Sequence, residues 1–315
     1  MSGTKIGIGF GSRGGLPSTQ ALCEYAERAE DLGIDSIWLS DRVVGPQPQL
    51  DIGCVMALIA ARTKKIKMGP AVLTLPAHNP VHVARTYATL DHMTGGGRRV
   101  IMAVGLGSDP RDCLACGIPR EERGPRMEEG VEVLRKLWSA TRVTHHGRFY
   151  NFDDVTIEPR PAKGPLDVWI GGRTDAALKR VAKYGDGWFP SFISPKEFAD
   201  GMQRLATLGA QHGRRIDPRE AGVLMLTHIT EDRGQAQQLL GLAATAFKQP
   251  ADVMAERCAI GSASECVEKI QAYVDAGCTK FVLFAVAPPE GLVAQTEIYG
   301  RSIIPKFENR SAATK

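Results

Sequence analysis

The stretch Asp167–Thr174 combines a short apolar strand, two glycines and a helix start, and this pattern can bind a phosphate group. The run Val168–Ile170 holds β-branched and aromatic residues, as expected for a strand that is covered on both faces. Glycines let backbone N–H groups approach an anion closely, and the N-terminus of the helix expected over residues 175–184 attracts negative charge. Four residues could contact the phosphate: Gly171, Gly172, the cation Arg173 and the helix N-cap Thr174. The alternative is an ordinary turn between a strand and a helix.

The rest of the chain must supply a fold that positions this turn, and its length and composition limit the possibilities. With 315 residues it can form one large α/β domain or two ordinary ones. No run approaches the roughly 20 apolar residues that a membrane-spanning helix needs. The first residues lack the charged, apolar and small-residue order of a signal peptide. We therefore expect a cytoplasmic protein without a membrane partner.

The cysteines and the net charge exclude other classes of protein. Seven scattered cysteines are typical of a reduced compartment rather than of a disulfide framework. Cys113 and Cys116 form a single C-x-x-C pair, and no second pair at metal-ligand spacing follows, so we expect no metal. A formal charge of +4, with the basic residues dispersed, does not suggest nucleic-acid binding.

Strand and helix patterns alternate along the whole chain. Strands are expected over residues 5–10, 34–39, 66–74, 100–105, 168–170, 186–190, 221–229 and 279–286. Helices are expected over residues 19–32 with Ser18 as N-cap, 52–62, 81–93, 126–138, 175–184, 195–212, 264–276 and 289–304. Eight such units close into a (β/α)8 TIM barrel, whose active site lies in the loops that follow the strands. We predict a single barrel domain over residues 1–315 with insertions at about 107–125, 140–165 (a hairpin over 144–161) and 232–260 (helical over 232–257).

The main alternative fold is a doubly wound open sheet. Residues Gly9–Gly14 match the G-x-G-x-x-G dinucleotide motif directly after the first strand. The third glycine of that motif should pack inside the opening helix, whereas here Gly15–Pro17 separates it from any helix. The barrel is therefore the preferred interpretation.

Several segments, in their order and spacing, give the chain a family resemblance. They are Ala29–Gly33 before Ser36–Asp41, Asn79–Pro80 with Thr89–Asp91 and Gly96–Arg98, Val104–Gly107, Val168–Gly172, Asp186–Pro190, and Gly261–Ser262 with Ala276–Gly277. Over nearly its whole length the chain resembles the bacterial luciferase-like superfamily of TIM-barrel flavin and deazaflavin enzymes. It is most similar to the branch that uses the 8-hydroxy-5-deazaflavin coenzyme F420.

The resemblance implies a cofactor site at the ends of the second to fifth barrel strands. A non-proline cis peptide bond that backs the flavin ring would lie at Ala71–Val72, and Thr74 would face the pocket. The acidic residue that contacts the polar edge of the ring would be Asp41. Gly107 would lie in the loop that closes over the ring, and the turn at Gly171–Thr174 would hold the coenzyme phosphate.

One departure from the family pattern puts the substrate in doubt. Relatives usually have histidine after the acidic residue, and this chain has Arg42. An arginine can bind a carboxylate or phosphate through two parallel hydrogen bonds. The alternative is that Arg42 is a solvated surface residue. His78 follows the third strand and could act as acid or base. His145 and His146 are adjacent on an expected strand and would point to opposite faces, so they cannot form a metal pair.

These interpretations together predict a site and a reaction. The catalytic candidates are Asp41, Arg42 and His78, the cofactor-binding candidates are Asp41, Ala71, Val72, Thr74, Gly107, Gly171, Gly172, Arg173 and Thr174, and the substrate-binding candidates are Arg13, Asp109, Ser191 and His228. The expected activity is hydride transfer between reduced coenzyme F420 and a small organic substrate. The alternatives are an FMN-dependent monooxygenase, a flavin-free NAD(P)H-dependent reductase, and a barrel that binds such a ligand without turnover. The resemblance also implies a possible homodimer.

Overall fold

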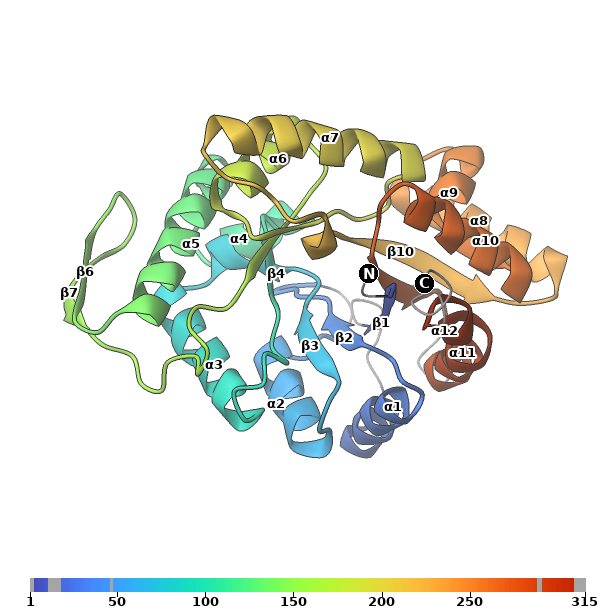
Figure 1. Cartoon of the computed structure of the whole chain (residues 1–315), viewed down its shortest axis with the longest axis horizontal. Coiled ribbons are helices and arrows are strands. Elements are labelled where there is room, and N and C mark those ends of the chain that lie inside the picture. Colours follow the sequence, from blue (N-terminus) through green and yellow to red (C-terminus); the bar gives the residue numbers. More distant parts are fainter. Residues whose placement is uncertain (1–2, 11–17, 46–47, 288–290, 309–315) are drawn as a thin grey trace, which may run out of the picture.

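The strands of the protein form the ring expected for a barrel (Figure 1). The computed structural model describes residues 3–10, 18–45, 48–287 and 291–308. The barrel strands are β1 (Lys5–Phe10), β2 (Ser36–Leu39), β3 (Lys67–Pro70) with its continuation β4 (Leu73–Thr74), β5 (Met102–Gly105), β8 (Val168–Gly171), β9 (Gly187–Phe189), β10 (Gly222–Ile229) and β12 (Lys280–Ala285). All pairings among them are parallel.

The ring closes through isolated bridges between two regular sheets. One sheet contains β10, β12, β1, β2 and β3 in that order, and the other contains β4, β5, β8 and β9. The parallel bridge Met68↔Val100 joins them on one side, and Trp188↔Ala221 and Ser191↔Leu224 join them on the other. The prediction of a (β/α)8 barrel is confirmed, and the open-sheet alternative is wrong because an open sheet would have two free edges. Most of the glycine motif that suggested it lies outside the described residues.

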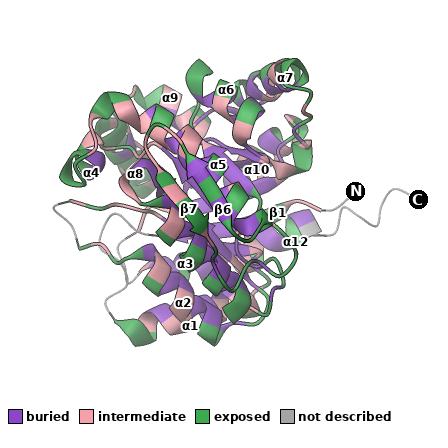
Figure 2. Ribbon diagram, turned by 90° about the vertical axis from the view of Figure 1, so that its left-hand side faces the viewer, coloured by how far each residue is buried: buried purple, intermediate pink, exposed green. Residues whose placement is uncertain are grey.

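Helices surround the strands, as Figures 1 and 2 show. They are α1 (Thr19–Asp31), α2 (Ile52–Arg62), α3 (Pro80–Met93), α5 (Arg123–Ser139), α6 (Asp175–Tyr184), α7 (Pro195–Gln211), α10 (Ala263–Asp275) and α11 (Leu292–Ile298), followed by the π-helical turn η5 (Tyr299–Ile303) and α12 (Ile304–Glu308). The predicted N-caps are confirmed, because Ser18 accepts from the N–H of Ala21 and Thr174 accepts from that of Ala177. The first residues of the predicted last helix, 289 and 290, lie outside the described residues.

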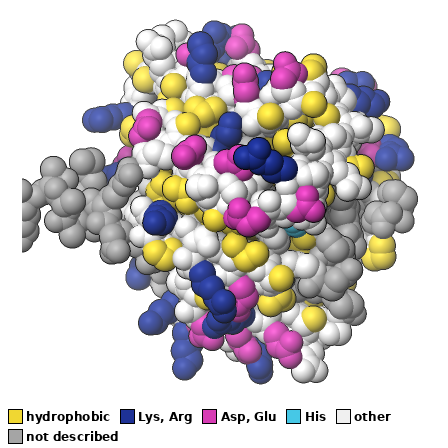
Figure 3. All heavy atoms as spheres, turned by 90° about the vertical axis from the view of Figure 1, so that its right-hand side faces the viewer, with side chains coloured by type: hydrophobic (Ala, Val, Ile, Leu, Met, Phe, Trp, Pro, Cys, Tyr) yellow, Lys and Arg dark blue, Asp and Glu magenta, His cyan; other side chains and the backbone are white. Residues whose placement is uncertain are grey.

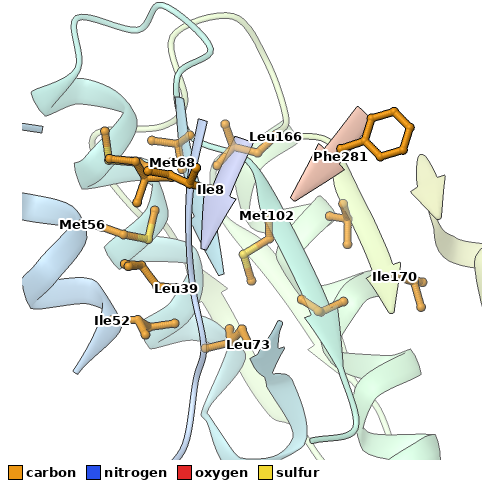
Figure 4. Close-up of a cluster of buried hydrophobic side chains, with 14 of the residues drawn as sticks. Ile8, Leu39, Ile52, Met56, Met68, Leu73, Met102, Leu166, Ile170 and Phe281 are labelled. Atoms are coloured by element: carbon orange, nitrogen blue, oxygen red, sulfur yellow. The ribbon is translucent and has the colours of Figure 1, made fainter. Parts of the chain in front are cut away.

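Side chains alternate between the outer and inner faces of the strands. Outward-facing residues such as Ile8, Leu39 and Met102 pack with helix residues such as Met56 of α2 in the main core (Figure 4). Inward-facing residues form a separate cluster of Trp38, Ala103, Trp169, Phe189, Leu224 and Val282. The inside of the barrel is therefore filled by large aromatic side chains.

Three additional segments extend the barrel. The first holds α4 (Pro110–Ala115) and η2 (Arg120–Glu122), the second is the hairpin of β6 (Val143–His146) and β7 (Asn151–Val155), which projects at the left of Figure 1, and the third holds α8 (Arg233–Phe247), α9 (Ala251–Arg257) and β11 (Ala259–Gly261). Two short turns, η1 (Leu75–Ala77) and η3 (Pro218–Glu220), complete the described elements.

Three details differ from the sequence-based prediction. Helix α5 begins at Arg123 and not at Arg126, because η2 leads directly into it. The helical stretch predicted over 232–257 breaks at Lys248, which caps α8 in the left-handed conformation, and Pro250 precedes α9. The short strand β11 was not predicted; it pairs with the upper part of β10.

Candidate active site

The floor of the barrel mouth is formed by Val72, which follows a cis peptide bond. The cis bond lies at Ala71–Val72, as predicted, between β3 and β4. Val72 packs on the inner aromatic cluster and is itself half-buried. A Cβ atom added at Gly105 would lie 2.5 Å from Val72 Cγ2, and one added at Gly171 would lie 3.1 Å from Val72 Cγ1. Glycines at these two strand ends therefore make room for the Val72 side chain.

Asp41 lies beside this floor, and Thr74 and His78 contact the same carboxylate oxygen. The backbone N–H of Thr74 donates to Asp41 Oδ2 at 2.8 Å, and His78 Nε2 lies 3.4 Å from that oxygen. The Asp41 side chain is 8% exposed and that of His78 is 31% exposed. The structure thus brings together a held carboxylate and a partly accessible imidazole, which is an arrangement that can move a proton.

Thr74 and Gly107 pack against each other at the edge of the same floor. Gly107 has φ 76°, and an added Cβ would lie 2.8 Å from Thr74 Cγ2. The Thr74 hydroxyl is buried, and within the described part of the chain it has no hydrogen-bond partner. An unpartnered buried hydroxyl beside the floor is a group that a ligand can satisfy.

Arg42 is held in an ion-pair network and is not a solvated surface residue. Its Nη2 donates to Asp109 Oδ2 at 3.1 Å and to the carbonyl of Val44. Its Nε lies 2.9 Å from Asp112 Oδ2 in an ion pair without hydrogen-bond alignment. The network joins the loop after β2 to α4.

The two carboxylates that pair with Arg42 are themselves engaged by other groups. Asp112 is fully buried and accepts from the N–H groups of Val43 and Val44. Asp109 caps α4, and hydrogen bonds from Arg111 hold the pKa of Asp109 well below its ordinary value. Asp109, a predicted substrate contact, is therefore a permanent anion that already has two guanidinium partners.

The turn after β8, for which the sequence predicts a phosphate site, has its free N–H groups one or two residues later than the sequence suggested. Gly171 belongs to β8 and faces Val72, whereas Gly172 has φ 108° and starts the turn. Among the described residues, no acceptor receives the backbone N–H of Arg173 or Thr174. Arg173 is exposed, and its Nη1 donates to the carbonyl of Phe192 at 2.9 Å. The free donors of the turn thus lie at 173 and 174, just ahead of α6.

The remaining predicted contacts are distributed around the other side of the mouth. Ser191 is half-buried and bridges to Leu224 after β9. His228 lies on β10 and is 9% exposed. Arg13 lies outside the described residues. His145 is buried and His146 is exposed, as expected for opposite faces of β6, and no group of three or more metal-binding side chains occurs within the described ranges.

The sequence did not indicate the importance of Asp112 or of Phe192. Asp112 gave no signal, because nothing local distinguishes it from Asp109. Phe192 has φ 54° and its ring centroid lies 4.4 Å from that of Phe247 in α8, a contact between residues far apart in the chain.

The chain belongs to the luciferase-like monooxygenase family, which it matches over residues 3–280. The F420-dependent glucose-6-phosphate dehydrogenase of Nakamurella multipartita is 30% identical over 319 residues, covering 91% of this chain and 92% of that protein. An F420-dependent secondary alcohol dehydrogenase superimposes with a TM-score of 0.82 at 22% identity, over 96% of this chain and 98% of that one. The monooxygenase RslO1 from Streptomyces bottropensis gives a TM-score of 0.80 at 20% identity, over 96% and 99%. These two structures support the fold alone, and the predicted family resemblance is confirmed.

The surface and the helices add two observations. On the face shown in Figure 3, which is the right-hand side of Figure 1, acidic and basic side chains are intermixed. No helix in the described ranges is both long and apolar enough to cross a bilayer.

Proposed function

We propose that the protein is an oxidoreductase that transfers a hydride between coenzyme F420 and a small organic substrate. The names of its relatives support this cofactor, and the Val72 floor supports a flat ring at the mouth of the barrel. The buried Thr74 hydroxyl and the carboxylate of Asp41 would meet the polar edge of the ring. A deazaflavin supplies the hydride chemistry, so the protein must bind, orient and exclude water.

The turn after β8 would hold the phosphate of the coenzyme. The N–H groups of Arg173 and Thr174 are free, they lie at the N-terminus of α6, and the Arg173 guanidinium is exposed beside them. Backbone donors and the helix dipole favour an anion at this position.

The proton that accompanies hydride transfer would be handled by His78. Asp41 is positioned by the N–H of Thr74 and in turn orients the imidazole through Nε2. A guanidinium is in general too weak an acid to donate the proton, and Asp109, whose pKa lies well below its ordinary value, has no proton to give. Arg42 and Asp109 are then positioning residues that hold the loop after β2 against α4.

The observation that carries the proposal is the inward position of Val72 between Gly105 and Gly171. Fluorescence titration of the purified chain with coenzyme F420, and separately with FMN, tests the proposal. We expect saturable binding of F420, weakened by roughly five- to tenfold in Arg173→Ala because a charge-assisted contact to phosphate is lost. Arg62→Ala is the control, since Arg62 pairs with Glu27 of α1 at the C-terminal end of α2, away from this turn. Tight FMN binding without a response to F420 would contradict the proposal.

An FMN-dependent monooxygenase is the second candidate, because the family that the chain matches over residues 3–280 is described as luciferase-like monooxygenase. The two functions differ in their use of oxygen, which a reduced FMN activates. Oxygen consumption by the FMN-loaded protein would favour the monooxygenase activity. NADH oxidation in the absence of any flavin would favour a nicotinamide-dependent reductase. A homodimer stays a prediction that light scattering can test.

A further inference from the structure

The inner face of β10 and β12 is an apolar wall that opens toward the mouth of the barrel. Alternate residues of a strand share a face, so Leu224, Leu226 and His228 point inward together. Low on this wall, Leu224 and Val282 belong to the buried aromatic cluster. Phe284, two residues further along β12, is half-buried, so the wall becomes accessible at its upper end.

The α8–α9 insertion adds more apolar side chains beside the upper part of this wall. Leu226 packs with Ala243 of α8 and Met254 of α9, and Phe284 and Val286 join the same cluster. The ring of Phe192 contacts that of Phe247. This side of the mouth lies opposite β3, β4 and β5, where the Val72 floor is, so it is the side that remains for a substrate.

His228 places a polar atom on this wall. Its Nδ1 is buried and, among the described residues, has no hydrogen-bond partner. Burial lowers the pKa of His228 although a hydrogen bond to the Val286 backbone acts in the opposite direction, so the ring is neutral at pH 7. A neutral imidazole that donates through one nitrogen presents the other as an acceptor.

Two arginines in the loops after β2 and β5 are already paired with carboxylates. Arg42 pairs with Asp109 and Asp112, and Arg111 pairs with Asp109. An anionic substrate that bound to Arg42 or Arg111 would have to break these pairs, one of which involves a fully buried carboxylate.

We propose that the substrate is an uncharged, largely apolar molecule that lies against Leu226, Phe284 and Val286 and donates one hydrogen bond to His228 Nδ1 from a polar group other than the one on its reacting carbon, whose proton is left to His78. This inference deepens the proposed function and rests on it, because the reacting carbon of the substrate must face a coenzyme ring that lies on Val72. It differs from the activity named for the glucose-6-phosphate dehydrogenases, whose substrate is a phosphorylated sugar.

Ligand-observed NMR on the full chain, with and without coenzyme F420, tests the proposal. The probes are 2-octanol, its ether 2-methoxyoctane, the matched anion 7-hydroxyoctanoate, and glucose 6-phosphate. We expect 2-octanol to bind at least tenfold more tightly than either anion, and more tightly than the ether.

Two variants separate the hydrogen bond from simple hydrophobic binding. His228→Leu should weaken the binding of 2-octanol by roughly tenfold, which is the contribution of one hydrogen bond to a buried acceptor. The affinity for the ether should stay unchanged. His82→Leu, at an exposed position of α3, is the matched control. Equal or tighter binding of an anion, no binding of 2-octanol, or equal effects of His228→Leu on alcohol and ether would each overturn the proposal. Binding of 2-octanol without any binding of F420 would instead contradict the proposed function alone.

Discussion

Arg42 Nε lies 2.9 Å from Asp112 Oδ2, and the Asp112 side chain has no exposed surface. The residue that replaces the usual histidine of the family is thus tied to a buried carboxylate in α4. The same carboxylate accepts from the N–H groups of Val43 and Val44, so Asp112 holds the loop after β2 through three contacts.

Removal of Asp112 should therefore destabilise the protein strongly. We expect Asp112→Ala to lower the free energy of unfolding by about 2–4 kcal/mol, because Arg42 and two backbone donors lose their partner. Asp175→Ala removes an exposed carboxylate from its pair with Arg204 and should cost less than about 1 kcal/mol. Urea denaturation measures both, and equal losses would show that the Asp112 network contributes no more than a surface ion pair.

The contact between Val72 and Gly105 predicts a compensating pair of mutations. Gly105→Ala places a Cβ atom 2.5 Å from Val72 Cγ2 and should destabilise the protein by about 1–3 kcal/mol. Val72→Ala removes that Cγ atom, so Gly105→Ala should cost much less in the Val72→Ala background. A double-mutant cycle by urea denaturation checks the coupling, and additive effects would contradict the packing described for the floor.

His78 should affect turnover without affecting cofactor binding. We expect His78→Gln to lower kcat by about 100-fold, because general acid and base catalysis contributes on that scale, and to leave the Kd for F420 unchanged. His82→Gln changes an exposed histidine on α3 and serves as control. An unchanged kcat in His78→Gln, measured once a substrate is in hand, would move the proton-transfer role to another group.

The lowered pKa of Glu30 predicts how the free energy of unfolding depends on pH. Partial burial raises the pKa of Glu30, but the N–H groups of Ile66, Lys65 and Lys64 together lower it by more, so the net pKa lies below the ordinary value of 4.5. A carboxyl whose pKa is lower in the folded state stabilises the protein fully above the unfolded value and loses this effect as the pH falls through the folded value. We expect Glu30→Gln to cost about 1–2 kcal/mol at pH 7 and clearly less at pH 3. A difference from wild type that is the same at both pH values would contradict this account.

Local signals in the sequence were sufficient for the barrel and for parts of the site. Capping residues such as Ser18 and Thr174 and the alternating strand patterns depend on neighbours in the chain, and the structure agrees with them. The position of the cis bond came from the family resemblance. The role of Arg42 could not be predicted, because its partners Asp109 and Asp112 lie on another loop about 70 residues away and only the folded barrel brings them together.

The lower interior of the barrel is plugged by Trp38, Trp169 and Phe189, each almost without exposed surface. Among the described residues the barrel is therefore open at one end only. A molecule on the Val72 floor must bind before, and leave after, any molecule that stacks above it. Steady-state kinetics should accordingly be sequential and ordered, with the coenzyme as the leading reactant.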